Sequence, residues 1–473
     1  MEVDESDSDV EDLELKQYID EIYQSRVGDY TKCKTYDIVP NTVASHPSGI
    51  SSVAATKHMR WLYTGGEDGE IRKYDFINSI NGQSLLTQVQ KHYYVESVTQ
   101  NAVFVSSWEN DEYVPEEDDY LLEKYGKKKV ALKGDETKKD DKTGSPPVKL
   151  SKKELKIEQE FNNEMQNQTE YLYRRKSPVY SLDIHSQAIF GLSGFKSGTI
   201  NLWTLRHDEG TCHHSFREHT GIVSCLKLSA DEKSFASGSW DKTVKIWDLN
   251  NGETIHTYTE HKTQISSLAY QPKNIAENDP VTDSPIFMRP TEDSLLLTTS
   301  ADGKTYLWDK RSSTPARSLV LNDNKTPPWA LSSCWSADGS IVYIGRRNST
   351  VDEWDVKEGK LIRQLSLPKG SGPVYNVKCL PNSKQIICAS NDNIRMWNLM
   401  ENETVLDKEH ILSNKLGVPQ VSFIIIPGHH GGMISEIYID PTCRFMITSS
   451  GNRGWEEKTT NICLFYTIKP IKN

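Results

Sequence analysis

The chain has 473 residues, of which 36% are hydrophobic and 26% are charged, and its formal net charge is −11. This length allows one large domain or two to three ordinary ones. The longest apolar runs are too short to span a bilayer, and the acidic opening MEVDESDSDV lacks the apolar core of a signal peptide, so we expect a soluble cytosolic or nuclear protein. None of the eight cysteines lies in a CxxC pair, which argues against a zinc ribbon or a disulfide framework.

The acidity is concentrated in a tail over residues 1–33. Residues 1–25 contain ten acids and one lysine, a net charge of −9, which leaves −2 for the rest of the chain. Ser6 and Ser8 each precede an acid by three positions, which predicts phosphorylation by an acid-directed kinase and further negative charge.

The second half of this tail, EDLELKQYIDEIYQ, has apolar residues at helical spacing: Leu15, Tyr18, Ile19 and Ile22. The spacing predicts an acidic amphipathic helix. This helix could pack against the rest of the protein or dock a partner, and both interpretations remain open.

Residues 34–473 carry an internal repeat, which is clearest over 218–249 and again over 260–310. Each copy has a histidine, an apolar strand, a turn, a second strand, an Asp turn and a third strand that ends in Trp-Asp. Weaker copies cover 46–75, 178–204, 328–355 and 373–398, and a last one runs from 428 to the end, which makes seven. Short apolar runs separated by turn residues predict an all-β protein.

Two insertions interrupt the repeats. Residues 91–176 contain the acidic run ENDEYVPEEDDY and the lysine-rich run GKKKVALKGDETKKDDKTGSPP, which are too charged to fold alone and predict disorder. The end of this segment, SKKELKIEQEFNNEMQNQTEYLYRRK, is typical of a helix. A smaller insertion covers 273–293, inside the fourth copy.

The repeat resembles the WD-repeat β-propeller family, which implies a ring of seven blades. In that fold a histidine, a Ser or Thr, the turn Asp and the Trp form a hydrogen-bonded chain that locks each blade and satisfies the buried polar groups. The first copy would use Tyr74 in place of the Trp. The matching residues are His46, Thr64 and Asp68, then His219, Ser237, Asp241 and Trp247, then His261, Thr298, Asp302 and Trp308.

The stretch PGHHGGM begins the last copy. Two adjacent histidines among glycines could hold a metal ion, but no carboxylate or cysteine lies at ligand spacing. The stretch stands where a blade's leading histidine belongs, so His430 is predicted to lock the seventh blade, and no metal or cofactor is expected.

The last copy ends at its third strand, which would leave an open sheet edge. The run KTYDIV at 34–39, just before the first copy, is the natural source of a fourth strand. We expect this strand to close the ring by pairing into the seventh blade.

A closer resemblance rests on GGEDGEIRKYD, PPWALSSCW, GRRNSTVDEWD, CASNDNIRMWN and PGHHGGMISEIYIDPTCRFMITSSGNRGW. These stretches are similar in order and wording to the suppressor-of-Ty WD-repeat family (eighth member) of the fungal SAGA transcriptional coactivator. The resemblance implies a nuclear, non-enzymatic subunit that binds TATA-binding protein, contacts other SAGA subunits and regulates the delivery of TATA-binding protein to promoters.

TATA-binding protein presents a basic DNA-binding surface, which clustered acids can complement. We hypothesise that acids of the tail and of the large insertion compete with DNA for that surface; the alternative is that they only keep the chain soluble. These acids are Asp4, Glu5, Asp7, Asp9, Glu11, Asp12, Glu116, Glu117, Asp118 and Asp119.

Two other functions stay open at this point: a WD-repeat reader of histone tails and a substrate receptor of a ubiquitin ligase. The reader would need an acidic or aromatic pocket at the mouth of the channel, and the receptor should copurify with a ligase scaffold. Direct sequence-specific DNA binding is disfavoured, because the body has no net positive charge and the tail would repel phosphates.

Overall fold

The computed structural model describes residues 29–86, 98, 100–109, 176–273, 289–290, 295–312, 314–319, 327–391, 393–399, 422–429, 433–451 and 460–471. The chain divides into one unit of Met1–Glu109 and Pro178–Asn473 and a second unit of Asn110–Ser177. The structure described below is that of the first unit.

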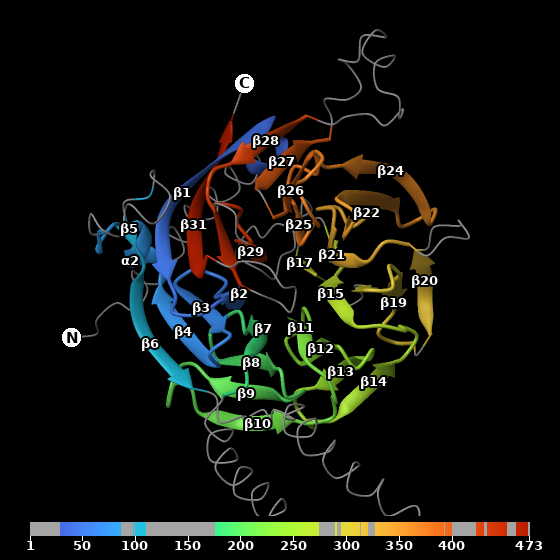
Figure 1. Ribbon diagram of the computed structural model, residues 1–473. Helices are drawn as coiled ribbons and strands as arrows, with labels where there is room; N and C mark the ends of the chain where they lie inside the picture. Colours follow the sequence, from blue (N-terminus) through green and yellow to red (C-terminus); the bar gives the residue numbers. More distant parts are fainter. Residues whose placement is uncertain are drawn as a thin grey trace, which may run out of the picture. The chain divides into compact units, whose positions relative to one another are not determined.

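This unit is a seven-bladed β-propeller, which confirms the predicted fold class (Figure 1). The blades follow one another in chain order, and each runs from an innermost to an outermost strand. Blades 1 to 3 are β2 (Ile50–Ala55), β3 (Trp61–Gly66), β4 (Glu70–Asp75) and β6 (Val103–Glu109); β7 (Val179–Ile184), β8 (Phe190–Phe195), β9 (Ile200–Thr204) and β10 (Cys212–Phe216); and β11 (Val223–Leu228), β12 (Ser234–Ser239), β13 (Val244–Asp248) and β14 (Thr254–Tyr258).

Blades 4 to 7 have the same antiparallel order, and blade 7 gains a short fifth strand that is parallel to its neighbour. They are β15 (Ile265–Tyr270), β18 (Leu296–Ser300), β19 (Thr305–Trp308) and β20 (Pro315–Leu319); β21 (Ala330–Trp335), β22 (Ile341–Arg346), β23 (Thr350–Asp355) and β24 (Lys360–Ser366); β25 (Asn376–Cys379), β26 (Gln385–Ala389), β27 (Ile394–Asn398) and β28 (Phe423–Ile426); and β29 (Ile434–Ile439), β30 (Phe445–Ser450), β31 (Ile462–Ile471), β1 (Thr35–Ser45) and β5 (Gln100–Asn101).

Serine hydroxyls link neighbouring innermost strands around the ring. Each donates to the carbonyl of the first residue of the next innermost strand. The pairs are Ser181 to Val223 at 2.9 Å, Ser224 to Ile265 at 2.7 Å, Ser266 to Ala330 at 2.7 Å, and Ser435 to Ile50 across the junction of blades 7 and 1. A hydroxyl is short enough to bridge two inner strands while it satisfies its own polar group.

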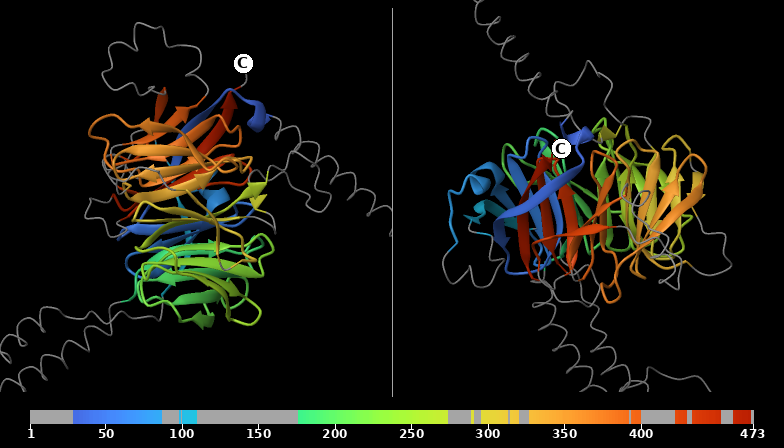
Figure 2. Two further views of the ribbon diagram at one scale, coloured as in Figure 1. Left: turned by 90° about the vertical axis from the view of Figure 1, so that its right-hand side faces the viewer. Right: turned by 90° about the horizontal axis from the view of Figure 1, so that it is seen from above.

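The ring closes where β1 supplies the outer antiparallel partner of β31 (Figure 2). The register runs from Thr35 opposite Ile471 to Ser45 opposite Ile462, with one irregularity between Pro40 and Thr42. The strand expected over 34–39 is therefore the first part of a longer one. Apolar residues of β1 complete the largest core cluster, in which Tyr36 and Ile38 pack with residues of blades 6 and 7.

The prediction that residues 91–176 form one insertion between blades was wrong at its start. β6 (Val103–Glu109) pairs with β4 as the fourth strand of blade 1. The excess before it lies within the blade and includes the helix α2 (Phe76–Ile80), which is capped by Asp75. Because β6 is outermost, only part of its side chains is covered, so its sequence VFVSSWE lacks the alternation that reveals inner strands.

The rest of that segment, 110–175, lies outside the described residues. The smaller insertion at 273–293 begins at a two-stranded pair, in which β16 (Pro272–Lys273) faces β17 (Arg289–Pro290). The helix predicted in the N-terminal tail also lies outside the described residues, which begin at residue 29.

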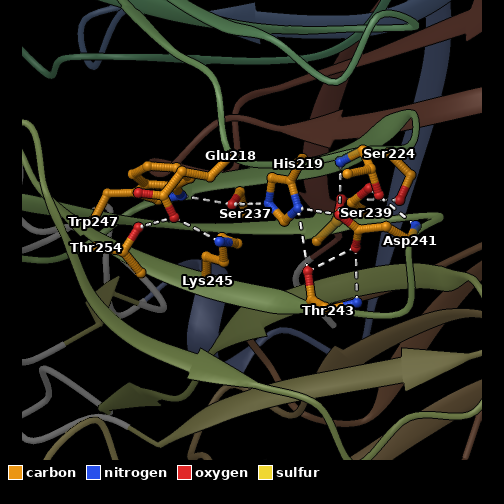
Figure 3. Close-up of polar contacts among 12 residues, drawn as sticks. Glu218, His219, Ser224, Ser237, Ser239, Asp241, Thr243, Lys245, Trp247 and Thr254 are labelled. Carbon is orange, nitrogen blue, oxygen red and sulfur yellow. Dashed lines mark hydrogen bonds and ion pairs between the residues drawn. The ribbon is translucent and has the colours of Figure 1, made fainter.

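Blade 3 contains a continuous hydrogen-bonded chain from its leading histidine to its tryptophan (Figure 3). His219 lies 2.8 Å from both Asp241 Oδ2 and Ser237 Oγ, and the Trp247 indole N–H donates to the same Ser237 oxygen at 2.7 Å. Burial alone would raise the pKa of Asp241, but hydrogen bonds from His219 and Thr243 hold it well below its ordinary value.

In blade 4 the hydrogen-bonded chain contains one additional residue, Ser300. His261 Nε2 and the Trp308 indole N–H each lie 2.8 Å from Thr298 Oγ1. His261 Nδ1 contacts Ser300 Oγ at 2.8 Å, and this hydroxyl donates to Asp302. The turn aspartate is thus reached through a serine and not directly.

Blade 1 departs from the expected arrangement. His46 Nε2 lies 3.0 Å from the Tyr74 hydroxyl and 3.4 Å from Thr64 Oγ1, whereas Asp68 forms an ion pair with Arg72. Arg72 stands four residues after Asp68 and offers a charged, two-pronged donor, which a neutral imidazole cannot match. Asp68 is therefore not a partner of His46.

In blade 7 the histidine that bonds the second strand is His429, with its Nε2 2.8 Å from Thr448 Oγ1 and its Nδ1 3.3 Å from Thr460 Oγ1. His430, which was predicted to lock the seventh blade, lies outside the described residues. The leading histidine stands four residues before the first strand in blades 1, 3 and 4, but His429 stands five before Ile434. The loop before the first strand of blade 7 has one extra residue, so the prediction named His430 instead of His429.

Loss of the first part of β1 should open the ring. We expect a chain that starts at residue 40 to be less stable than one that starts at residue 29 by about 3–6 kcal/mol, since it loses four buried side chains of the largest core cluster, Tyr30, Cys33, Tyr36 and Ile38. Thermal unfolding and size-exclusion chromatography of both chains test this. Equal unfolding midpoints would show that residues 29–39 are not needed for closure.

Acid should weaken the lock of blade 4. Burial lowers the pKa of His261 to about 4, against the attraction of Asp302, which raises it. A folded-state pKa below the unfolded value of 6.5 gives stability that is complete above pH 6.5 and is lost as the pH falls toward 4, by about 3 kcal/mol.

A His261→Gln variant keeps hydrogen-bonding capacity but does not titrate. Denaturant unfolding at pH 7 and pH 4.5 should show a smaller loss of unfolding free energy with acid in this variant than in the natural chain. Parallel losses in the two proteins would remove His261 from the acid response.

Candidate functional site

The residues predicted to contact a partner lie outside the described part of the chain. They are the tail acids Asp4, Glu5, Asp7, Asp9, Glu11 and Asp12, the insertion acids Glu116, Glu117, Asp118 and Asp119, and the phosphorylation candidates Ser6 and Ser8. Their roles stay predictions. The described residues form two features that were not predicted from the sequence. These are a central channel and an aromatic surface at one mouth of this channel.

The channel is a cavity of about 490 Å³ that is lined by residues of all seven innermost strands. Its polar lining includes Lys57, Lys227 and Lys378, together with Asp183 and Glu436. This volume is in the range of ligand pockets. The chemistry of the side chains therefore decides what the channel does.

Besides Glu232 and Asp440, the channel lining holds two carboxylates, Asp183 and Glu436, that tie blades together. Asp183 Oδ2 accepts the Leu228 N–H of blade 3 at 2.7 Å, and Glu436 Oε2 accepts the Val53 N–H of blade 1 at 2.8 Å. Burial raises the pKa of Asp183, although the Lys227 ammonium 3.8 Å away and the backbone donors oppose this. These acids hold strands and are occupied by backbone N–H groups.

Three of the channel serines are occupied in the same way, whereas the Ser332 hydroxyl has no hydrogen-bond partner among the described residues. The hydroxyls of Ser181, Ser224 and Ser266 donate to backbone carbonyls, so their hydrogen bonds serve the ring rather than a catalytic base. Toward one mouth the lining becomes apolar, where Leu331, Tyr375 and Met433 of blades 5, 6 and 7 form a small buried cluster.

At this mouth two stretches of the sequence, PPWALSSCW and GRRNSTVDEWD, lie in contact. The Arg347 N–H donates to the Trp329 carbonyl at 2.9 Å, and the Arg347 guanidinium stacks on the Trp329 indole with 4.2 Å between guanidinium carbon and ring centre. The indole is 40% exposed. Arg347 and Trp329 thus form one rigid cation–aromatic pair at the surface.

Arg346, the residue before Arg347, supports this pair through hydrogen bonds to the neighbouring backbone. Arg346 is 1% exposed, forms a 2.7 Å ion pair with the equally buried Asp352, and donates to the carbonyls of Gly303 and Pro328 at 2.7 and 3.0 Å. It stands at the strand end that Ser239 occupies in blade 3. The available sequence signal was a pair of adjacent arginines at a strand end where blades 3, 4 and 7 have serine.

Over the described residues, no group of three or more His, Cys, Asp or Glu side chains is arranged to hold a metal ion. In the same part of the chain, no helix has the length and apolar character needed to cross a membrane.

Comparison with known proteins gives matches over nearly the whole chain. A family model described as the SPT8 beta propeller matches residues 36–128, 145–284 and 276–469. The chain is 33% identical to the SAGA complex subunit Spt8 of Schizosaccharomyces pombe, with 92% of this chain and 79% of that protein covered. It is 32% identical to the SAGA complex subunit SPT8 of Saccharomyces cerevisiae, over 95% of this chain and 75% of that protein.

A more distant match, the methylosome protein WDR77 of Xenopus laevis, is 23% identical over 37% of this chain and 51% of that protein. The family model includes the stretches PPWALSSCW, GRRNSTVDEWD and PGHHGGM and the closing strand from residue 36. The seven blades and these matches together show that the chain belongs to the SPT8 β-propeller family.

Proposed function

We propose that this protein is a nuclear, non-enzymatic subunit of a SAGA coactivator that binds TATA-binding protein and regulates its delivery to RNA polymerase II promoters. The observation that carries the proposal is the identity of 32–33% over 92–95% of the chain to two proteins named as SAGA complex subunits. Residues of all seven innermost strands line the propeller's central channel, and a closed ring of this kind suits a role in holding partners.

The charge of the chain supports a basic partner. The first 25 residues carry a net charge of −9, and a further eight acids without a compensating base follow over 109–123. Acids clustered in this way attract a basic DNA-binding surface over several ångströms in water, and they raise the rate of encounter. In this mechanism the acids Asp4, Glu5, Asp7, Asp9, Glu11 and Asp12 occupy part of the surface of TATA-binding protein that otherwise holds DNA.

Removal of the tail should weaken this binding in a salt-dependent way. We expect a chain of residues 26–473 to bind TATA-binding protein about tenfold more weakly than the full chain at low salt, with a flatter dependence of affinity on salt, because the attraction between charges is screened. Fluorescence anisotropy over a salt series measures both quantities.

The matched control keeps the length of the tail and replaces its six named acids by Asn or Gln. It should behave like the truncated chain if charge is the cause. Equal affinities and equal salt slopes for all three proteins would remove the tail from the mechanism, whereas the failure of every form to bind TATA-binding protein would remove the proposed partner.

A further inference from the structure

One edge of the propeller, which we call the loop face, consists of the loops between the second and third strands and the residues that precede each innermost strand. A repeated backbone hydrogen bond defines equivalent positions on it. The residue after the second strand donates its N–H to the segment before the first strand: Lys196 to Pro178, Trp240 to Ile222, Ala301 to Gln264 and Arg347 to Trp329. Blades 2 to 5 thus present these loops side by side.

Aromatic and apolar residues gather on this face around the channel mouth. Tyr180 and Trp240 pack edge to face with ring centres 6.0 Å apart, and they line a shallow depression together with Leu331, Tyr375 and Met433. The exposed Trp329 stands beside it under the Arg347 guanidinium. Tryptophan, tyrosine and arginine are the residues that contribute most at protein interfaces.

Cations follow the same four blades. They are Lys196, Lys242, Lys262, Lys304 and Arg347, and we call them, with Tyr180, Trp240 and Trp329, the basic–aromatic arc. Lys242, Lys262 and Arg347 are exposed. Within the described part of the chain, none of the ion pairs uses these five side chains.

The acids of the arc are largely occupied. Asp241 is bound by His219 and Thr243, and Asp302 accepts from Ser300 and from the Lys304 N–H. Glu260, next to the locking histidine of blade 4, is an exposed carboxylate. Three exposed cations, Lys242, Lys262 and Arg347, and two half-buried lysines therefore stand beside Glu260, whereas Glu218, next to the locking histidine of blade 3, is paired with Lys245.

The arc ends at blade 1. The position of Lys196 and Arg347 is taken there by Glu67, whose N–H donates to the Gly49 carbonyl, and in blade 6 by Asn391. Within the described residues, the exposed cations of this face thus lie on blades 2 to 5, apart from Lys369 before the innermost strand of blade 6. A confined, cationic and aromatic surface complements carboxylates that flank an apolar side chain.

We propose that the basic–aromatic arc docks an acidic segment of another protein, which inserts an aromatic or aliphatic side chain at the channel mouth while its carboxylates bind the surrounding cations. A basic histone tail would be repelled by the same cations. Nucleic acid fits less well, because its phosphates offer no apolar side chain for the depression between Trp240 and Leu331.

The described part of the chain begins on the side of the ring opposite the loop face. β1 runs from Thr35 to Ser45, which precedes His46 at the loop face, so Thr35 lies at the opposite edge. There the Gln385 amide donates to the Thr35 hydroxyl at 2.8 Å. This geometry favours a segment from another protein as the occupant.

The probes are short fluorescent peptides and the full-length protein. One peptide combines Asp and Glu with Phe and Leu, a second has Ser in place of Phe and Leu, and a third has Lys in place of the acids. We expect the natural chain to bind the first peptide, and a Lys262→Glu/Arg347→Glu variant to bind it at least about tenfold more weakly in anisotropy titrations. Trp329→Ala should also weaken binding, with less effect on its salt dependence.

The matched control is Lys233→Glu/Lys357→Glu. Both lysines are exposed and lie in turns between first and second or third and fourth strands, which the antiparallel order places at the opposite edge of the ring. This variant should bind the first peptide within about twofold of the natural chain. Equal thermal unfolding midpoints for all variants would show that the substitutions act on binding and not on folding.

Several results would overturn the proposal. These are no binding of the acidic apolar peptide, equal binding of the serine-containing or lysine-containing peptide, and equal loss of binding in the control variant. Short duplex DNA that binds more tightly than the peptide and depends on Lys262 and Arg347 would assign the arc to nucleic acid. Tighter peptide binding by residues 26–473 than by the full chain would assign it to the protein's own tail.

Discussion

The pairing of β1 with β31 is the constraint on which the rest of the structure depends. Each blade is held by its neighbours, through serine hydroxyls and apolar side chains, so the sequence of contacts is stable only if it continues from blade 7 to blade 1. β1 completes blade 7 with residues from the other end of the chain, and Ser435 and Glu436 bind the backbone of blade 1 across the junction. An unpaired β31 would instead present an open edge.

Within this ring, buried polar groups position the loops that meet partners. Blade 3 joins His219 directly to Asp241, blade 4 reaches Asp302 through Ser300, and blade 5 uses the ion pair of Arg346 and Asp352. Such groups are costly to bury unless every one is satisfied, so they permit few arrangements of the backbone. Arg346 also binds two carbonyls below Trp329, which connects the stability of blade 5 with the geometry of its surface.

The chain separates charge of opposite sign. The first 25 residues carry a net charge of −9, whereas cations from blades 2 to 5 gather beside aromatic side chains on the loop face. The first suits a basic partner such as TATA-binding protein, and the second suits an acidic segment. A rigid propeller keeps its own surface groups in fixed positions, and several channel groups, among them Asp183, Glu436 and Ser224, are occupied in holding strands. This distribution agrees with the proposed role as a subunit that brings other proteins together.

The sequence alone determined the period, because it is local: the spacing of Asp241 and Trp247 recurs in Asp302 and Trp308. It also indicated the closure, since the last copy lacks a strand and the run at 34–39 was the natural source of one. Only the tertiary structure decided which neighbour each buried polar group chose. Asp68 bonds Arg72 rather than His46, His429 rather than His430 reaches Thr448, β6 (Val103–Glu109) belongs to blade 1, and Trp329 meets Arg347. These outcomes depend on competition between groups from different strands and on how much of a strand is covered, and neither is encoded in the spacing of residues along the chain.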